Sequence, residues 1–367
     1  MNETSTDGNS ANNLEFQGKI AIITDVPSHE DDFHSPDRLV KKYGAKKIVH
    51  VTWPRDFVAE RGKISESVAA LAADREIKAL IISQAVPGTN DAIDKFKQIR
   101  DDVFIVFCTC QEPAAETTMR ANLLFDCNQV GMGSAMARQA KKQGAKVFIH
   151  YTFPRHMSQP LLSARRDAIK QECLKEGIFF VDAIAPDPTG EAGFEGAQKF
   201  ITEDVPKLVA KYGEDTAFFS TNCAHQKALI RAVVDCHAIF PQPCCPSPFH
   251  GFPEALGINA ESGYADLNYV IGEACLIAEE KNMTDRLSTW PVSASMMFTN
   301  AGAEYAVKWI NDEVPKIGID RTVLEDCMNA YIEEVIGEAS VAYISSCTVG
   351  GKTYENYKLV LMSYLDF

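Results

Sequence analysis

Residues 41–55 read KKYGAKKIVHVTWPR, and residues 141–155, one hundred positions further on, read KKQGAKVFIHYTFPR. Nine of the fifteen positions are identical in the two copies. Each copy has the lysines of a helix end, a glycine at Gly44 or Gly144, an apolar run typical of a strand, and the ending Thr-aromatic-Pro-Arg. The repeat favours a chain built of two similar α/β halves. The alternative is a chance match between two helix-to-strand corners, because lysine followed by glycine is an ordinary helix-stop signal.

Apolar runs alternate with helical patterns on both sides of the repeat. Strands are predicted at 19–24, 48–52, 78–83, 103–109, 147–151, 179–183, 217–221 and 357–362, and helices between most of them. Such alternation is typical of parallel sheets that are covered by helices on both faces. The predicted fold class is therefore α/β, with two doubly wound parallel-sheet lobes joined by a hinge.

The length of the chain also favours two lobes, because 367 residues exceed the size at which a single core stops growing. We predict a disordered tether at 1–13. The first lobe is predicted to comprise 14–126 plus about 288–325, and the second 127–287 plus about 326–367. The hinge segments are expected near 125–129, near 288–295 and in the C-terminal region.

The overall charge argues against nucleic acid as a partner. The formal net charge is −14, and a nucleic-acid surface needs clustered cations to displace counterions from phosphates. No apolar run approaches the roughly 18 residues needed to cross a bilayer, so no transmembrane segment is expected.

The first thirteen residues, MNETSTDGNSANN, are polar and small. Such a leader commonly follows the lipid-modified cysteine of an exported bacterial lipoprotein, and Met1 would then not be the native start. A frayed cytoplasmic N-terminus is the alternative. The eleven cysteines are an odd number and do not resemble an oxidised framework, although an exported protein of an anaerobic organism would also keep them reduced.

Several short strings resemble a known group of proteins. They are QAVPGT at 84–89, HYTFPRHMS at 150–158, LSARRD at 162–167, APDPTG at 185–190, FFSTNC at 218–223 and PQPCCPSP at 241–248. Together with the order of the predicted elements, they resemble an uncharacterised bacterial family of periplasmic-binding and LacI-effector-like proteins. Some members carry lipoprotein leaders and others are labelled transcriptional regulators. The resemblance spans nearly the whole chain from Gly18 onward and implies a type I periplasmic-binding fold.

The resemblance also has limits. In the group, a helix of the second lobe carries an arginine that reaches into the ligand cleft, and residues 162–167 follow that order. No helix-turn-helix segment is expected before Lys19, so a complete repressor is not expected. Cys223 stands where sugar binders usually have an aspartate after the asparagine, so a sugar is not implied.

Ligands of doubly wound sheets bind beyond the carboxyl ends of the strands. We therefore predict that Trp53 and Phe153 sandwich a planar or apolar part of a ligand, and that arginines pair with its carboxylate or phosphate. The alternatives are that the aromatic side chains fill the lobe interiors and that the arginines form surface ion pairs. The predicted ligand-binding residues are Asp25, Ser28, Thr52, Trp53, Arg55, Gln84, Thr109, Thr152, Phe153, Arg155, Arg166, Asn222 and His225.

Other chemistry is less well indicated. Residues 28–34 combine two histidines with three acids, but their spacing fits no established ligand motif, and a solvated loop before a helix explains them. The vicinal pair Cys244–Cys245 can bind soft metals, although cysteines in a Pro-rich turn more often pack as small residues. The sequence has no GxGxxG, P-loop, GxSxG or HExxH pattern. We expect no catalytic residue, no metal and no cofactor.

The expected function is the binding of a small polar molecule, anionic or zwitterionic, in a cleft between the lobes. The protein would act as an exported, membrane-anchored solute receptor for a membrane transporter or sensor. A second hypothesis is a cytoplasmic effector-sensing protein related to LacI-type regulators, without its own DNA-binding segment. A third is an enzyme that uses Cys223 with His225 or a bound metal.

Overall fold

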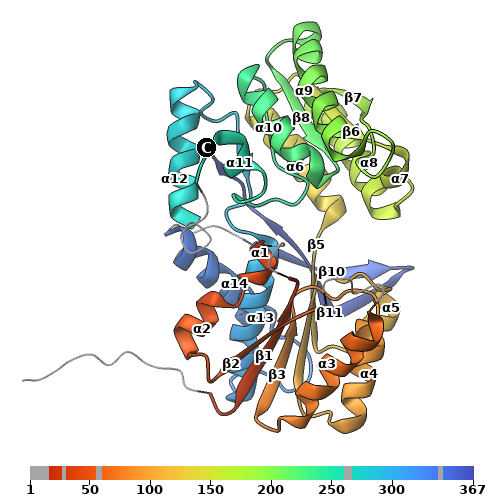
Figure 1. The fold of residues 1–367 in the computed structure, drawn as a ribbon, viewed down its shortest axis with the longest axis vertical. Helices are drawn as coiled ribbons and strands as arrows, with labels where there is room; N and C mark the ends of the chain where they lie inside the picture. Colours follow the sequence, from red (N-terminus) through yellow and green to blue (C-terminus); the bar gives the residue numbers. More distant parts are fainter. Residues whose placement is uncertain (1–15, 27–29, 55–59, 260–266, 338–341) are drawn as a thin grey trace, which may run out of the picture.

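The computed structural model describes residues 16–26, 30–54, 60–259, 267–337 and 342–367. These residues form two lobes, one above the other in Figure 1, each with a sheet between layers of helices. The predicted residues Ser28 and Arg55 lie outside the described ranges, as does the expected tether at 1–13.

The first lobe is built on a sheet of seven described strands in the order β10-β11-β5-β4-β3-β1-β2. Its strands are β1 (Lys19–Thr24), β2 (Ile48–Thr52), β3 (Ile77–Ile82), β4 (Phe104–Cys108), β5 (Leu123–Cys127), β10 (Ala342–Val349) and β11 (Lys352–Met362). The described pairs are parallel except β10 with β11. Its helices are α1 (Glu30–Phe33), α2 (Asp37–Tyr43), α3 (Arg61–Ala73), α4 (Thr89–Ile99), α5 (Ala114–Thr117), α13 (Ala294–Ile310) and α14 (Arg321–Ile336).

Both faces of this sheet are buried, as the continuous apolar strands predict. On β1, Ile20 and Ile22 pack in a core with α13 and α14, whereas Ala21 and Ile23 pack in a second core with α3 and α4. Successive side chains of a strand point to opposite faces, so one apolar strand supplies both cores.

The second lobe contains a smaller parallel sheet with the described order β7-β6-β8. Its elements are α6 (Gln129–Lys142), β6 (Val147–Thr152), α7 (Pro154–Met157), α8 (Pro160–Glu176), β7 (Phe179–Ile184), α9 (Gly193–Tyr212), β8 (Thr216–Ser220), the 3₁₀ turn η1 (Cys223–His225), α10 (Gln226–Asp235), α11 (Phe252–Leu256), α12 (Leu267–Glu280), β9 (Ser288–Thr289) and β12 (Leu365–Asp366). Phe148 packs with α6 and α8, and the next residue, Ile149, packs with α9 and α10 on the other face.

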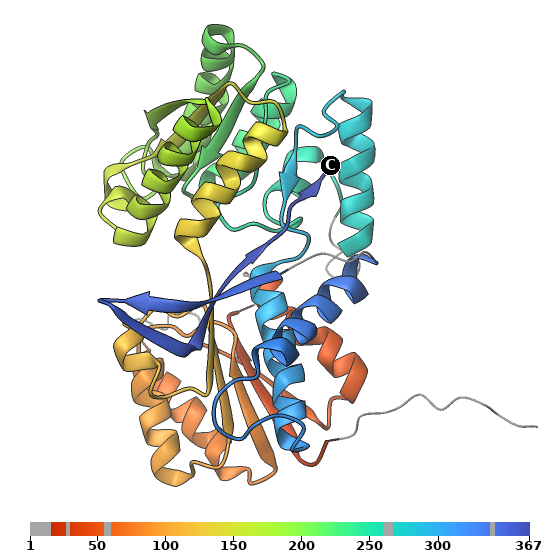
Figure 2. The ribbon, with the colours of Figure 1, turned by 180° about the vertical axis from the view of Figure 1, so that it is seen from behind.

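Three connections between the lobes can be followed within the described ranges, and Figure 2 shows the α6 and β11 ends of two of them from behind. β5 ends at Cys127 and α6 begins at Gln129; β9 ends at Thr289 and α13 begins at Ala294; β11 ends at Met362 and β12 begins at Leu365. These places coincide with the predicted hinge segments. Short connections between two separately packed lobes permit rigid-body movement of one lobe against the other.

The C-terminal part of the chain lies in a different lobe from the predicted one. Residues 326–367 were expected in the second lobe, but Leu324, Met328 and Ile332 of α14 pack in the first core, and β11 pairs with β5. Of the described residues from 326 onward, those of β12 and Phe367 pack with the second lobe.

The two copies of the repeat occupy different places in their sheets. β2 follows Gly44 and lies at the edge of the first sheet, whereas β6 follows Gly144 and lies between β7 and β8. In strand order, β6 takes the place that β1 has in the first lobe. The prediction of two doubly wound lobes is confirmed. The repeat itself is a match between two helix-to-strand corners and does not mark equivalent strands.

Candidate functional site

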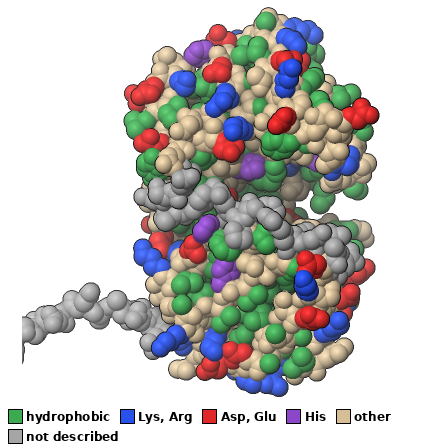
Figure 3. Space-filling view, in the orientation of Figure 1, with side chains coloured by type: hydrophobic (Ala, Val, Ile, Leu, Met, Phe, Trp, Pro, Cys, Tyr) green, Lys and Arg blue, Asp and Glu red, His purple; other side chains and the backbone are tan. Residues whose placement is uncertain are grey.

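The surface is hollowed at the waist of the molecule, between the two lobes (Figure 3). The parallel strands of each sheet end at one edge, so the residues that follow them gather together. A hydrogen bond joins the two lobes there: Ser247 Oγ, in the loop before α11, donates to Asp31 Oδ2 on α1 at 2.9 Å. Burial raises the pKa of the Asp31 carboxyl, although Ser247 and Ser293 oppose this by donating hydrogen bonds.

In the first lobe, the structure places the predicted residues Asp25, Thr52, Trp53 and Gln84 at the strand ends. Asp25 is buried and its carboxylate accepts a hydrogen bond from Val26 N–H at 2.7 Å. Thr52 ends β2 and Gln84 follows β3; both are partly exposed. Trp53 is different, because its ring belongs to the core with α3 and α4 and its indole N–H donates to the Gln84 carbonyl at 2.9 Å. Trp53 therefore fills the lobe interior, the alternative that the sequence left open.

Thr109 follows β4 with a backbone φ of 48°. This left-handed conformation is unfavourable for a β-branched residue and is found mostly where the surrounding structure requires it. Its N–H donates to the Phe125 carbonyl at 2.9 Å, which fixes the residue between β4 and β5. Backbone strain of this kind concentrates at functional sites.

In the second lobe, the predicted residues Thr152, Phe153 and His225 lie together with two further residues, His156 and Thr221. The Phe153 and His156 rings are 4.1 Å apart at their centroids, and His156 Nδ1 is 2.9 Å from Thr221 Oγ1. Thr221 Oγ1 is also 3.3 Å from Thr152 Oγ1. His225 is fully buried, which lowers its pKa, and its Nδ1 lies 2.7 Å from Ser220 Oγ.

Asn222, another predicted residue, begins the turn that follows β8. Its side-chain oxygen accepts a hydrogen bond from Ala224 N–H at 2.9 Å, which caps η1. The cap aims the Cys223 side chain away from His225: the Cys223 sulfur contacts the Cys244 sulfur at 3.4 Å, while His225 bonds to Ser220. The Cys223–His225 pair considered for catalysis is not assembled as a dyad.

The two predicted arginines of this lobe form ion pairs on the surface. Arg155 binds Asp187 through two hydrogen bonds of 2.7 and 2.8 Å, which hold the pKa of the Asp187 carboxyl far below its usual range. Arg166 donates to Asp182 at 2.7 Å and to Asp167 at 2.6 Å. These pairs leave few donors of either guanidinium free for a ligand. They agree with the alternative that the arginines form surface ion pairs.

Arg165, the neighbour of Arg166, was not among the predicted residues. Adjacent helix positions point about 100° apart, so Arg165 faces inward where Arg166 faces β7 and solvent. Arg165 is 2% exposed, and its guanidinium lies 5.1 Å from the Phe219 ring and donates to Gln129 Oε1 at 2.8 Å. Burial lowers its pKa. Among the described residues its Nε has no hydrogen-bond partner, and the charges that act on it come from cysteine sulfurs rather than from carboxylates. The LSARRD string contains both arginines, and only the helix phase distinguishes them.

Two hollows with measurable volumes, about 300 and 590 Å³, lie elsewhere. The smaller is lined by residues of α10 and α11 and by Lys281, which follows α12, and the larger by residues at the amino ends of β1 and β2. Neither contains a predicted ligand-binding residue.

The two sheets, the connecting segments and the hollow at the waist define a type I periplasmic-binding fold. The chain belongs to the family described as protein of unknown function (DUF3798), whose model matches residues 18–288. An uncharacterised protein of Treponema pallidum (strain Nichols) is 35% identical over 165 residues, which are 45% of this chain and 76% of that protein. The family resemblance inferred from the sequence is confirmed.

Solved structures agree on the architecture. The crystal structure of a proposed transcriptional regulator from Clostridium difficile 630 matches with a TM-score of 0.85 at 21% identity, covering 96% of this chain and 100% of that one. A sugar ABC transporter structure from Actinomyces odontolyticus ATCC 17982 matches with a TM-score of 0.54 at 10% identity, covering 81% and 84%. At these identities the likeness concerns the fold. No helix among the described residues is long and apolar enough to span a membrane.

Proposed function

We propose that this protein binds a small polar molecule, with an anionic group, in the hollow between its lobes. The observation that carries the proposal is Arg165. Burial of an unpaired charge costs several kcal/mol, and a cation–π contact such as that with Phe219 returns only about 0.5–2 kcal/mol. A carboxylate or phosphate of a ligand would supply the missing partner through charge-assisted hydrogen bonds.

The other groups at the strand ends suit the uncharged part of such a ligand. From the second lobe, Thr152 offers a hydroxyl group and His156 an imidazole ring. Phe153 is 1% exposed and its ring is covered by His156 and Arg155, so it fills the lobe interior as Trp53 does. From the first lobe, Gln84 and Thr109 offer hydrogen-bonding groups. A site with contributions from both lobes favours the closed arrangement when a ligand is present, because the ligand gains all its contacts only there.

The protein would act as an exported solute receptor. The polar leader of the sequence and the shared fold with the sugar ABC transporter structure support this part of the proposal. A cytoplasmic effector sensor is the second candidate, favoured by the likeness to the proposed transcriptional regulator. Fractionation of cells that express the native gene separates them: recovery outside the cytoplasm supports the receptor, and recovery only in the cytosol supports the sensor.

Ligand binding is tested by thermal melting of the purified protein with a panel of carboxylates, phosphates, sugars and amino acids. We expect an anionic compound to raise the melting temperature of the wild type and of Arg166→Met, the matched surface control. Arg165→Met should lose this response, because removing one partner of a buried charge pair costs about 2–5 kcal/mol of binding free energy. Each variant is compared with its own ligand-free melt. An equal response in Arg165→Met, or a response to uncharged compounds alone, contradicts the assignment.

A further inference from the structure

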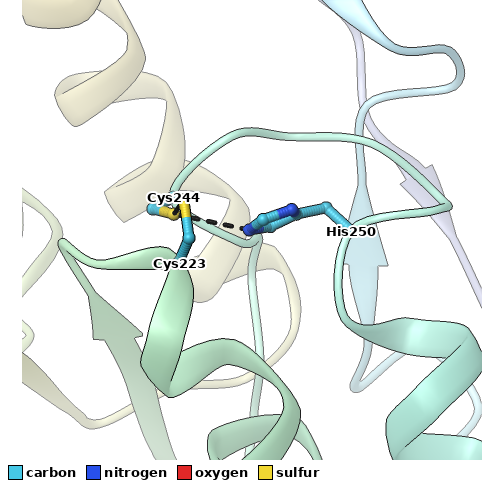
Figure 4. Close-up of side chains that lie close together, drawn as sticks. All are labelled: Cys223, Cys244 and His250. Carbon is cyan, nitrogen blue, oxygen red and sulfur yellow. Dashed lines mark hydrogen bonds between the residues drawn. The ribbon is translucent and has the colours of Figure 1, made fainter. Parts of the chain in front are cut away.

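Three cysteine sulfurs and a histidine nitrogen lie together beside the waist, in the second lobe (Figure 4 shows Cys223, Cys244 and His250). Cys223 Sγ is 3.4 Å from Cys244 Sγ and 3.9 Å from Cys245 Sγ, and Cys244 Sγ is 3.9 Å from Cys245 Sγ. His250 Nε2 is 3.6 Å from Cys244 Sγ. The ligand atoms of Cys223, Cys244 and His250 all lie within 4.8 Å of one another.

The four separations given match edges of a tetrahedral zinc site; Cys245 lies within 3.9 Å of both other sulfurs but outside the three-residue group, so its side chain would turn toward His250 to complete the tetrahedron. With Zn–S bonds of about 2.3 Å and Zn–N bonds of about 2.0–2.1 Å, tetrahedral geometry places two sulfurs about 3.8 Å apart and a sulfur and a nitrogen about 3.6 Å apart. A disulfide is a poor explanation of the same contacts, because its sulfurs are about 2.05 Å apart and all these cysteines are free.

The chain brings the four donors together from two segments. Cys223 begins η1 directly after β8, and the Asn222 cap holds it there. The other three donors, Cys244, Cys245 and His250, belong to the loop between α10 and α11. Pro243 and Pro246 flank the cysteine pair there and restrict the backbone. Cys244 is buried, while Cys223 and Cys245 are exposed, so an ion has a route of entry.

The surroundings suit a metal centre with thiolate ligands. Three thiolates, one neutral histidine and Zn²⁺ together carry a net charge of −1, and Arg165 is a cation whose charge interacts with all three cysteines. From the first lobe, the Asp31 carboxylate interacts electrostatically with His250 and accepts the Ser247 hydrogen bond. Carboxylates near a ligating histidine are common supporting groups in zinc sites.

We propose that Cys223, Cys244, Cys245 and His250 form a zinc-binding site of the Cys₃His type. The sequence alone predicted no metal, because Cys223 lies twenty-one residues before Cys244 and the spacing follows no familiar motif. The site goes beyond the proposed solute binding and does not depend on it. An ion there would fix the loop that carries Ser247, the residue that contacts the first lobe.

The test is a titration of the full chain, stripped of metal by a chelator and kept reduced by a phosphine, with Zn²⁺ in competition with a chromophoric chelator. We expect one Zn²⁺ per chain. Cys223→Ser and His250→Gln should weaken binding by more than the roughly 10–100-fold that loss of a supporting group costs. Cys236→Ser, at the C-terminal end of α10, is the control and should bind as the wild type does. Circular dichroism of each variant checks that it is folded.

A second readout identifies the ligands. Co²⁺ in place of zinc should show the strong visible absorption of a tetrahedral site and a sulfur-to-cobalt charge-transfer band, both reduced in Cys223→Ser. The proposal is overturned if the wild type binds no Zn²⁺ or binds Cu⁺ alone. It is also overturned if folded Cys223→Ser binds Zn²⁺ as tightly as the wild type does. If Arg165→Met weakens zinc binding but leaves the ligand response of the melt intact, the arginine serves the metal and the solute-binding assignment fails while the zinc site stands.

Discussion

Thr109, which directly follows β4, holds a left-handed backbone conformation with φ of 48°. For residues other than glycine this conformation costs roughly 1–2 kcal/mol, and asparagine adopts it more readily than threonine. Thr109→Asn should therefore raise the free energy of unfolding by about 1 kcal/mol, measured by chemical denaturation. If the threonine side chain contacts the ligand, the same variant should lose part of the ligand-dependent rise in melting temperature.

The control for Thr109 is Thr202→Asn, because Thr202 lies in α9 and donates to the Gln198 carbonyl at 3.0 Å. Asparagine is no better than threonine inside a helix, so no gain is expected there. Equal effects in the two variants would mean that backbone strain at Thr109 does not limit stability.

Among single residues, the sequence predicted the type of group better than the particular residue. The LSARRD string indicated an arginine for the cleft and Arg166 was chosen, but the sequence did not fix the helix phase of α8, which buries Arg165 and places Arg166 in surface ion pairs. Trp53 and Phe153 share a motif, and both rings are buried in their lobes instead of facing a ligand. The cluster of Cys223 with Cys244 depends on tertiary structure, and the only signal in the sequence was the vicinal cysteine pair between prolines.

At the scale of elements, β6 carries a fully buried histidine, His150, between the rings of Phe180 and Phe219, whose centroids lie 6.0 and 5.8 Å away. Burial lowers the pKa of His150 below 6.5, although Asp182, 3.4 Å away, opposes this; Arg165 and Arg166 act in the same direction as burial. Below pH 6.5 the unfolded chain therefore takes up a proton that the folded strand resists. The stability that depends on a neutral His150 is therefore present at neutral pH and is lost as the pH falls.

His150→Phe should reduce that loss. At pH 5 the contribution of this histidine is at most about 2 kcal/mol, from 1.36 kcal/mol per pH unit below 6.5. Urea denaturation at pH 7 and pH 5 should show a smaller difference in the variant than in the wild type. His237→Asn, at an exposed position, should leave the difference unchanged. If His150→Phe loses as much stability between pH 7 and pH 5 as the wild type does, groups other than His150 cause the loss.

The order of strands and helices was predictable because both sheets have continuous apolar strands between clear helix signals. β10 and α14 were harder to place. β10 alternates buried and exposed residues at the sheet edge, and α14 stays in the first lobe, to which the chain has returned at α13. Such long-range returns depend on which core accepts the apolar face, which local sequence patterns do not specify.

For the whole molecule, two separately packed lobes and the three short connections between described elements suit the proposed closing on a ligand. A ligand that contacts both lobes stabilises the closed arrangement by mass action, and tight ligands remain bound during purification. The hydrogen bond between Ser247 and Asp31 already links the lobes beside the proposed zinc site. Metal and solute would therefore act on the same junction from adjacent positions.

The most direct measurement is native mass spectrometry of freshly purified wild-type protein, compared with its denatured mass and with Arg165→Met. The account predicts a small-molecule mass, additional to any zinc ion, that is lost on denaturation and is absent from Arg165→Met but present in Arg166→Met. The account is contradicted if the same small-molecule mass remains on Arg165→Met. It is also contradicted if the wild type carries no such mass and no anionic compound shifts its melting temperature.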